Sequence, residues 1–163
     1  MIQTRSPAGK TATVIVRPFE RRDVGAVLVL MRALAVFEGY DDKFRVTEAD
    51  IVEHGLGPSP RLGVLVAEVD AAIVGIAVHY LIPWTYDLKP VVVLKELYVA
   101  GAARGMSVGH ALVGRLRDHA IGIGASAIKW TVLRSNEPAK AFYRSLDGQA
   151  DDIWELWQLT IDG

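Results

Sequence analysis

Cysteine is absent from this 163-residue sequence, and neither sign of charge predominates. Without cysteine the chain has no disulfide, no thiolate metal site and no cysteine nucleophile, which suits a reducing compartment such as the cytoplasm. Eighteen Lys and Arg residues stand against nineteen Asp and Glu residues, a formal net charge of -1. Because this balance gives no basic field, we expect neither a nucleic acid partner nor binding to an anionic membrane.

Long hydrophobic runs are also absent. The longest apolar stretch, residues 71–82, contains Gly75 and His79 and is too short to span a bilayer. The first ten residues lack the apolar segment of a secretory signal. The four histidines show no ligand spacing such as HExxH, so no metal site is expected. These absences predict a soluble protein without a metal.

The residues that are present predict one α/β (α+β) domain. With 51% hydrophobic residues, a chain of this length buries one sizeable core. We expect a flexible tail over residues 1–12 and a single domain over 13–163. Hydrophobic periodicity predicts strands at 13–17, 62–69, 72–81, 91–99, 127–133 and 153–161, and helices at 20–37, 47–55, 107–121 and from 136. This order predicts a mixed sheet with helices on both faces.

Three glycine-containing loops compete as phosphate sites. Gly9-Lys10-Thr11 resembles the end of a P-loop, but no strand precedes it and the first motif glycine would fall at Thr4. The segment 122–127 precedes a strand, whereas a dinucleotide loop follows one. Only Arg104 to Gly109 joins a strand to the start of a helix, where backbone amides can hold a pyrophosphate. An ordinary turn remains the alternative, because two glycines are a weak signal.

The residues around this loop are similar to the GNAT superfamily of acyl-CoA-dependent N-acetyltransferases. The superfamily signature is Gln/Arg-x-x-Gly-x-Gly/Ala after a strand, and the chain looks most like the spermidine/spermine and thialysine branch. The matching pieces include Val16-Arg-Pro18, Leu34-Ala-Val-Phe-Glu38, Pro83-Trp84, Leu94 to Val99 and Asn136-Glu-Pro-Ala-Lys-Ala-Phe-Tyr143. The resemblance implies a strongly twisted sheet with a splayed central strand pair, acetyl-CoA as co-substrate, and a homodimer.

The resemblance also implies which residues bind the cofactor. The strand end Leu97, Tyr98 and Val99 would meet the acetyl and pantetheine groups, and the loop would surround the pyrophosphate. The loop set is Arg104, Gly105, Met106, Ser107, Val108, Gly109 and His110, with Asn136, Ala139 and Tyr143 from a second segment. Ser107 replaces the first glycine of the signature, and a positive φ there would strain a serine.

Two residues are the candidates for proton transfer. Tyr143 matches the family's general acid, which protonates the departing thiolate; the alternative is packing beside Phe142 and Leu146. Glu96 is positioned to take a proton from the attacking amine, directly or through water; the alternative is a solvated surface carboxylate. Strict alternation along the strand would place Lys95 and Glu96 on opposite faces.

For the acceptor amine, the resemblance points to an aromatic and acidic pocket. Its members would be Phe37, Glu38, Trp84, Lys95, Lys129 and Trp130, although Trp130 is equally a candidate core residue. Lys95 stands where the branch has an acidic residue, and Ile82 replaces a second one. Both departures weaken the case for a polyamine.

The sequence therefore predicts an N-acetyltransferase that acetylates a primary amine of a small molecule (a polyamine, diamine or amino-acid-like compound) by direct attack in a ternary complex. One alternative is acetylation of a protein N-terminus or lysine, which the bulky segment from Pro83 to Tyr86 disfavours. The other is a non-catalytic acyl-CoA-binding module, which Ser107 and Lys95 favour and Tyr143 opposes.

Overall fold

The computed structural model describes residues 2–5 and 11–161 and divides into two compact units. One unit ends at Trp130 and contains the sheet and three helices; the second begins at Thr131 and contains one helix. The expectation of a single domain over 13–163 remains a prediction.

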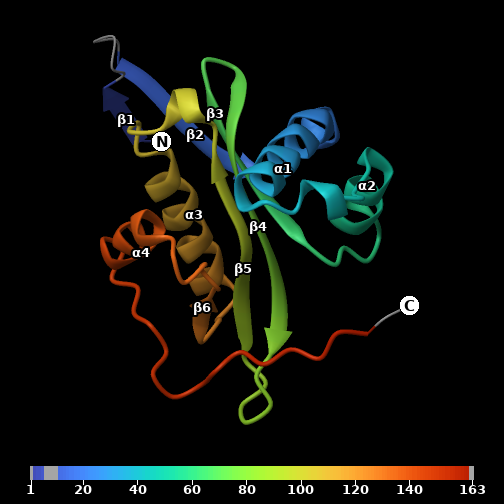
Figure 1. Ribbon diagram of the computed structural model, residues 1–163. Coiled ribbons are helices and arrows are strands. Elements are labelled where there is room, and N and C mark those ends of the chain that lie inside the picture. Colours follow the sequence, from blue (N-terminus) through green and yellow to red (C-terminus); the bar gives the residue numbers. More distant parts are fainter. Residues whose placement is uncertain (1, 6–10, 162–163) are drawn as a thin grey trace. The chain divides into compact units, whose positions relative to one another are not determined.

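The first unit is built on a mixed sheet, as the sequence predicts (Figure 1). The described strands follow one another in the order β1 to β6. Every neighbouring pair is antiparallel except β5 and β6, which are parallel. The strand bounds are β1 Ile2–Arg5, β2 Thr11–Pro18, β3 Gly63–Val69, β4 Ala72–Pro83, β5 Pro90–Val99 and β6 Ala127–Lys129.

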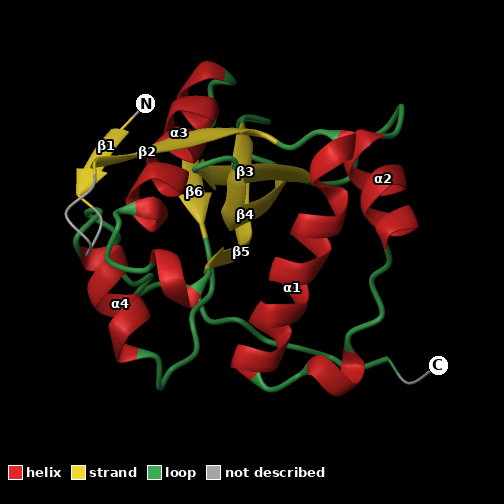
Figure 2. Cartoon of the chain, turned by 90° about the horizontal axis from the view of Figure 1, so that it is seen from above, coloured by secondary structure: helices red, strands yellow, loops and turns green. Residues whose placement is uncertain are grey.

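Helices cover both faces of this sheet (Figure 2). On one face, α1 (Val24–Glu38) and α2 (Glu48–Leu56) bury a cluster with β3 and β4 that includes Val27, Ile51 and Ile76. On the other face, α3 (Val108–Gly122) buries Leu112 and Leu116 against β2 to β5. The two-sided arrangement confirms the predicted fold class.

The helix ends follow from local sequence. Thr47 begins α2 with a capping box, in which its hydroxyl accepts a hydrogen bond from the amide of Asp50 (3.2 Å) and the Asp50 carboxylate accepts one from the Thr47 amide (2.8 Å). Gly39 ends α1 in the left-handed conformation, with φ of 77°. The chain then turns directly into Tyr40, whose amide donates to the carbonyl of Ala35. Tyr40 is thereby fixed immediately after α1.

An ion-pair network joins β2 to the segment before α1. Arg17 on β2 contacts the nearly buried Asp23 at 2.6 Å and Glu68 on β3 at 2.9 Å. The hydrogen bonds from Arg17 lower the pKa of Asp23 below its usual value, against the opposing effect of burial. The network fixes where the chain leaves the sheet to form α1.

The second unit contains α4 (Glu137–Arg144) and a C-terminal segment. As predicted, Asn136 caps α4: its side-chain oxygen accepts a hydrogen bond from the Ala139 amide at 3.1 Å. The predicted strand at 153–161 is wrong, because the segment has no regular secondary structure. Residues 131–161 contain no other strand to pair with it, and a lone strand leaves its backbone groups unsatisfied.

The N-terminal prediction is also corrected in part. Of the expected tail over residues 1–12, Ile2–Arg5 forms β1 and residues 11 and 12 belong to β2. The two strands pair antiparallel, so the backbone polar groups there have partners in the sheet. The rest of the tail, including Gly9 and Lys10 of the P-loop alternative, lies outside the described residues.

Candidate active site

A β-bulge in β5 determines which face of the sheet carries Glu96. In the pairing with β4, Leu94 lies opposite His79 and Glu96 lies opposite Val78, so Lys95 is the extra residue. Leu94 and Leu97 both pack on the α3 side, whereas Tyr98 packs on the α1 side. The extra residue shifts the alternation and puts Glu96 on the α1 side with Tyr98. The simple alternation assumed from sequence is therefore wrong at Lys95, which is exposed.

Glu96 is held in a setting that disfavours its negative charge. Its Oε2 is buried and has no hydrogen-bond partner among the described residues. Burial raises the pKa of this carboxyl above its usual value; Lys95 opposes the shift and Glu38 adds to it. A carboxyl whose pKa is raised holds a proton more strongly than an ordinary glutamate, which suits it to accept a proton from an ammonium. It is not the solvated surface residue of the alternative interpretation.

Tyr40 is a neighbour of Glu96 that the sequence analysis missed. Burial, with the nearby charges of Glu96 and Glu38, raises the pKa of its phenol. Glu38 is the last residue of α1 and is exposed, so the end of α1 brings an acidic and an aromatic residue to this part of β5. The signal available was an aromatic residue directly after the helix-ending Gly39.

Beyond the bulge, no described strand pairs with β5 on the side away from β4. The parallel pairing with β6 covers only Val91 to Val93 and ends at Lys129. From Leu94 to Val99, β5 is paired with β4 but not with β6. The resemblance implies that the cofactor contacts backbone groups of Leu97 to Val99 in this stretch, which β6 does not pair.

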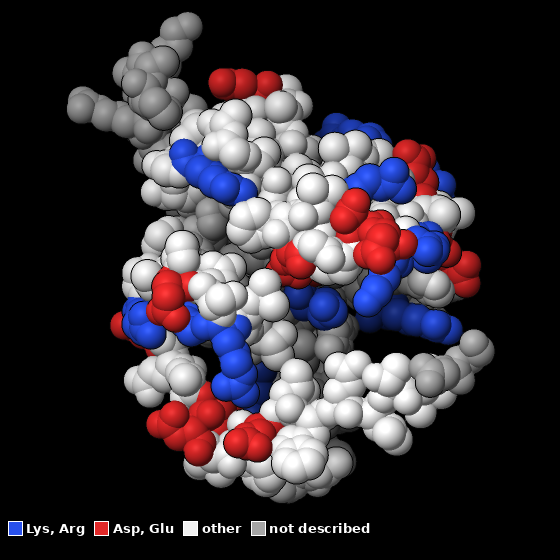
Figure 3. All heavy atoms as spheres, viewed as in Figure 1, with Lys and Arg blue, Asp and Glu red and all other residues white. Residues whose placement is uncertain are grey.

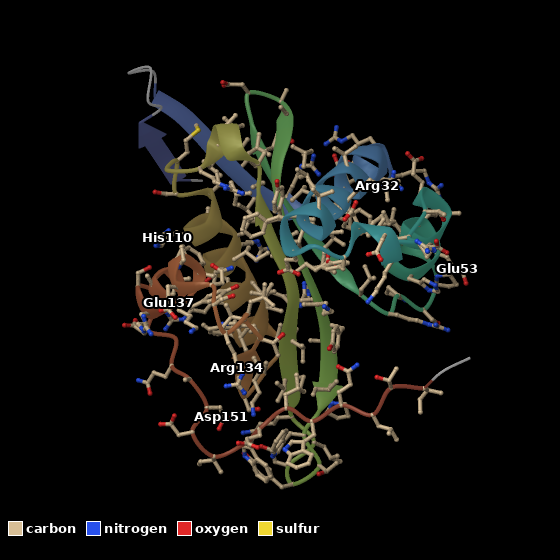
Figure 4. The ribbon with its side chains drawn as sticks, viewed as in Figure 1. Arg32, Glu53, His110, Arg134, Glu137 and Asp151 are labelled. Carbon is tan, nitrogen blue, oxygen red and sulfur yellow. The ribbon has the colours of Figure 1, made fainter. Side chains whose placement is uncertain are left out.

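The loop after β5 contains two residues in the left-handed conformation. Gly105 and Ser107 both have positive φ, 78° and 55°, and Ser107 immediately precedes α3. Met106 and Val108 are buried, and Gly105 and Ser107 are exposed. The two buried side chains anchor the loop to the core. His110, labelled in Figure 4, lies on the first turn of α3 after Gly109. The first amides of an α-helix have no acceptor within the helix, so a helix start of this kind is suited to an anion.

Arg104 turns from this loop toward the α1 side. Its guanidinium carbon lies 5.6 Å from the Phe37 ring centre and 6.0 Å from that of Tyr98, and its Nε donates to the Val99 carbonyl at 3.3 Å. Both are cation–π distances. The first residue of the expected pyrophosphate loop thus contacts Phe37, an expected acceptor residue, and Tyr98, an expected cofactor residue.

The remaining acceptor candidates in the first unit lie at the other end of β5. Trp84 follows β4, and the Nζ of Lys129 on β6 lies 4.7 Å from its ring centre. Tyr86 meets Trp84 edge to face, with 6.0 Å between ring centres. Trp130 instead packs against the core on the α3 side, as the alternative interpretation expects.

The second-segment candidates belong to the second unit. Asn136 and Ala139 form the cap of α4, and Tyr143 lies two turns later, with its ring 5.3 Å from that of Phe142. Tyr143 is half-buried. Tyr143, the predicted general acid, therefore lies on a regular helix. Its role in proton transfer remains a prediction.

Residues 2–5 and 11–161 are the part of the chain that the structure describes. No group of three His, Asp or Glu side chains lies close enough there to hold a metal ion. No helix in these ranges has the length and hydropathy to cross a membrane. On the face drawn in Figure 3, Lys and Arg side chains are interspersed with Asp and Glu.

Comparison with known proteins agrees with this geometry. The model of the acetyltransferase (GNAT) family matches residues 30–147. Thialysine N-epsilon-acetyltransferase of Bos taurus is 28% identical over 154 residues, 90% of each chain. The human spermidine/spermine N(1)-acetyltransferase-like protein 1 is 29% identical over 157 residues, which are 89% of this chain and 22% of that protein.

Solved structures share the fold. An aminoglycoside acetyltransferase from an uncultured soil metagenomic sample, in complex with sisomicin, superposes with a TM-score of 0.78 at 16% identity, covering 91% of this chain and 97% of that one. Ribosomal-protein-alanine N-acetyltransferase from Brucella melitensis has a TM-score of 0.74 at 23% identity, with 91% and 99% covered. At these identities the likeness concerns the fold alone.

Proposed function

Because this chain belongs to the acetyltransferase (GNAT) family, we propose that it transfers the acetyl group of acetyl-CoA to a primary amine of a small molecule. The observation that carries the proposal is the buried carboxylate oxygen of Glu96, which has no partner among the described residues and lies in the stretch of β5 that β6 does not pair. A proton acceptor next to free backbone groups is what acyl transfer to an amine requires. The names of the thialysine and spermidine/spermine relatives support a small amine as the acceptor.

In the proposed reaction the amine attacks the acetyl carbonyl directly in a ternary complex. Glu96 accepts the proton that the ammonium must lose, itself or through one water. A backbone amide near Tyr98 or Val99 donates to the oxyanion of the tetrahedral intermediate. When the intermediate collapses, the C–S bond breaks and Tyr143 protonates the thiolate of CoA. The products are the acetylated amine and CoA.

The cofactor would lie along the loop and the free side of β5. Amides from Gly105 to Gly109 would hold the pyrophosphate at the start of α3, and Leu97 to Val99 would hold the pantetheine arm. Asn136 and Ala139 at the cap of α4 would add contacts from the second segment. The left-handed loop conformation at Ser107 supports this proposal, because the serine adopts the geometry that the signature glycine provides.

The test is thiol release from acetyl-CoA over diamines, thialysine, aminoglycosides and short peptides. Turnover with small amines and not with peptides would support the proposal. Tight CoA binding without any turnover would support the non-catalytic module instead. Within the active enzyme, Tyr143→Phe should lower kcat by roughly 10²- to 10⁴-fold while CoA affinity, measured by calorimetry, stays the same. An unchanged kcat would remove Tyr143 from this role.

We also propose the homodimer that the resemblance implies. The C-terminal segment gives some support, because Trp154, Leu156, Trp157 and Leu159 are at least two-thirds exposed, and large apolar side chains so exposed are typical of contact surfaces. Light scattering of the purified protein would measure the mass. Twice the chain mass of 17.8 kDa supports the dimer, and a single chain mass excludes it.

A further inference from the structure

The side chain of Arg104 leaves the expected cofactor loop and contacts α1. Its guanidinium carbon lies 5.6 Å from the centre of the Phe37 ring and 6.0 Å from the centre of the Tyr98 ring. Phe37 belongs to the last turn of α1, and Tyr98 packs with the core cluster on the α1 side of the sheet. The guanidinium therefore connects the end of α1 to β5.

A backbone carbonyl of β5 holds this side chain in place. The Nε of Arg104 donates a hydrogen bond to the Val99 carbonyl at 3.3 Å. Val99 lies opposite Gly75 of β4. The amide of the next residue, Ala100, donates to the carbonyl of Val74 at 2.8 Å. In an antiparallel sheet this pattern marks a non-hydrogen-bonded pair, so the Val99 carbonyl points away from β4 and accepts from Arg104 instead.

These contacts lie next to the proposed proton acceptor. Tyr98 follows Glu96 by two positions on the same face of β5, which is roughly 7 Å along the strand. Because one guanidinium lies over both rings, the Phe37 ring is brought beside Tyr98. The end of α1 thus supplies an aromatic ring to the surroundings of Glu96.

Core packing alone does not fix the orientation of the Phe37 ring. Phe37 is 58% exposed, and a side chain so exposed has several accessible rotamers unless a neighbour selects one. A guanidinium over the face of the ring is attracted to its π electrons and favours one orientation. Since Arg104 is itself held by the Val99 carbonyl, it sets where the Phe37 ring stands relative to β5.

We propose that Arg104 is a positioning residue for the acceptor amine: its side chain holds the Phe37 ring where that ring contacts the acceptor near Glu96. This inference rests on the proposed acetyl transfer and adds a residue to its acceptor side. The resemblance assigns Arg104 to the cofactor loop, whereas the contacts assign its side chain to the acceptor. Loss of the side chain should therefore affect acceptor binding and not CoA binding.

The test measures the two binding steps separately, with the amine of the panel above that has the highest kcat/KM. In Arg104→Met, KM for this amine at saturating acetyl-CoA should rise about three- to tenfold with kcat nearly unchanged, because a contact that serves binding alone is weakened. CoA affinity, measured by calorimetry, should change by less than about twofold, because the loop amides remain. Arg104→Lys, which keeps a positive charge over the rings, should raise KM less than Arg104→Met.

A double-mutant cycle tests whether Arg104 acts through Phe37. Phe37→Leu removes the ring and should itself raise the acceptor KM. Adding Arg104→Met to it should raise KM by less than about twofold further, because the guanidinium has lost the ring that it positions. A merely structural role of Arg104 would instead give two effects that multiply.

Arg32→Met is the matched control. Arg32 is an exposed residue of α1 whose guanidinium carbon lies 5.5 Å from the centre of the Phe44 ring, so the control removes the same side chain and the same kind of contact. Arg32 precedes Phe37 by five positions, about 140° around the helix. Acceptor KM and CoA affinity should both stay the same in this variant. Thermal unfolding of every variant verifies that the fold is kept.

The possible failures are distinct. If Arg104→Met lowers CoA affinity and leaves the acceptor KM unchanged, the side chain is a cofactor ligand; the inference is then wrong and the proposed function stands. If the effects of Arg104→Met and Phe37→Leu on KM multiply, Arg104 does not act through Phe37 and the inference is again wrong. If no amine of the panel releases thiol from acetyl-CoA with the wild-type protein, the proposed function fails and the inference fails with it.

Discussion

Ser107 shows how one residue can satisfy a motif that it does not match by identity. Its φ of 55° and ψ of 17° are the left-handed values that a glycine adopts without strain. The sequence analysis noted that a positive φ at this position would strain a serine, and the structure has that positive φ. The loop geometry is therefore retained. The left-handed conformation of Ser107 strains the backbone and lowers the stability of the folded state.

Removing that cost is a direct experiment. Ser107→Gly should raise the free energy of unfolding by up to about 1 kcal/mol and leave CoA affinity equal or tighter, because the strain is relieved and the amide is kept. Ser107→Ala is the matched control: it keeps the Cβ and the strain and removes only the hydroxyl. If both variants lose CoA affinity equally, the hydroxyl is a ligand and strain is not the deciding factor.

Glu96 is the residue whose pH dependence reports most directly on mechanism. Because burial raises its pKa, the acidic limb of kcat/KM should lie above the ordinary glutamate value of about 4.5. Glu96→Gln should lower kcat/KM and abolish that limb, since an amide does not titrate. Retention of the same limb in the variant would assign it to another group. The measurement is kcat/KM from pH 4.5 to 9 with a saturating cofactor.

At the scale of secondary-structure elements, Arg17 connects β2, β3 and the segment before α1. Arg17→Met would leave Asp23 buried without its cation, which typically costs about 3–5 kcal/mol. The double variant with Asp23→Asn should recover part of this loss, because the isolated charge is gone. Urea unfolding of the two variants measures the difference. A single variant as stable as the wild type would show that the network contributes little.

Sequence patterns predicted most elements and failed where tertiary context decides. Regular periodicity and the caps at Thr47 and Asn136 gave three of the helices closely, because those signals are local. The bulge at Lys95 has no local signal: it exists only through the pairing with β4. The predicted strand at 153–161 failed for a related reason, because alternation describes a strand's faces but does not supply a neighbour. The closeness of Tyr40 to Glu96 was likewise not predicted, because it depends on where α1 ends relative to β5.

At the scale of the whole molecule, stability should depend on pH through one buried histidine. His79 on β4 is 7% exposed, and its ring centre lies 5.3 Å from that of His119 on α3. Gly63 leaves it room, because a Cβ there would come within 2.5 Å of the imidazole. Burial, with a smaller effect of His119, lowers the pKa of His79 from 6.5 to about 4.

The sign of the effect follows from proton binding. Between pH 6.5 and 4 the unfolded chain protonates His79 and the folded chain does not, so the free energy of unfolding falls as the pH falls through this window. The loss amounts to about 3 kcal/mol at the low end. Glu96 acts in the opposite direction, since its raised pKa lowers stability as the pH rises above its ordinary value. Comparing the wild type with a variant that lacks His79 separates the contribution of His79 to the pH dependence from that of Glu96.

His79→Leu should therefore flatten the acid side of the stability profile, while His54→Gln, on α2, should leave it unchanged. Chemical unfolding at pH 7, 6, 5 and 4 measures both, and the wild type should lose more stability than His79→Leu across the series. Parallel profiles for the wild type and His79→Leu would contradict the assignment. Because the folded chain keeps His79 neutral above about pH 4, the loss of stability arises from proton binding by the unfolded chain and should not by itself lower the CoA affinity of the folded protein.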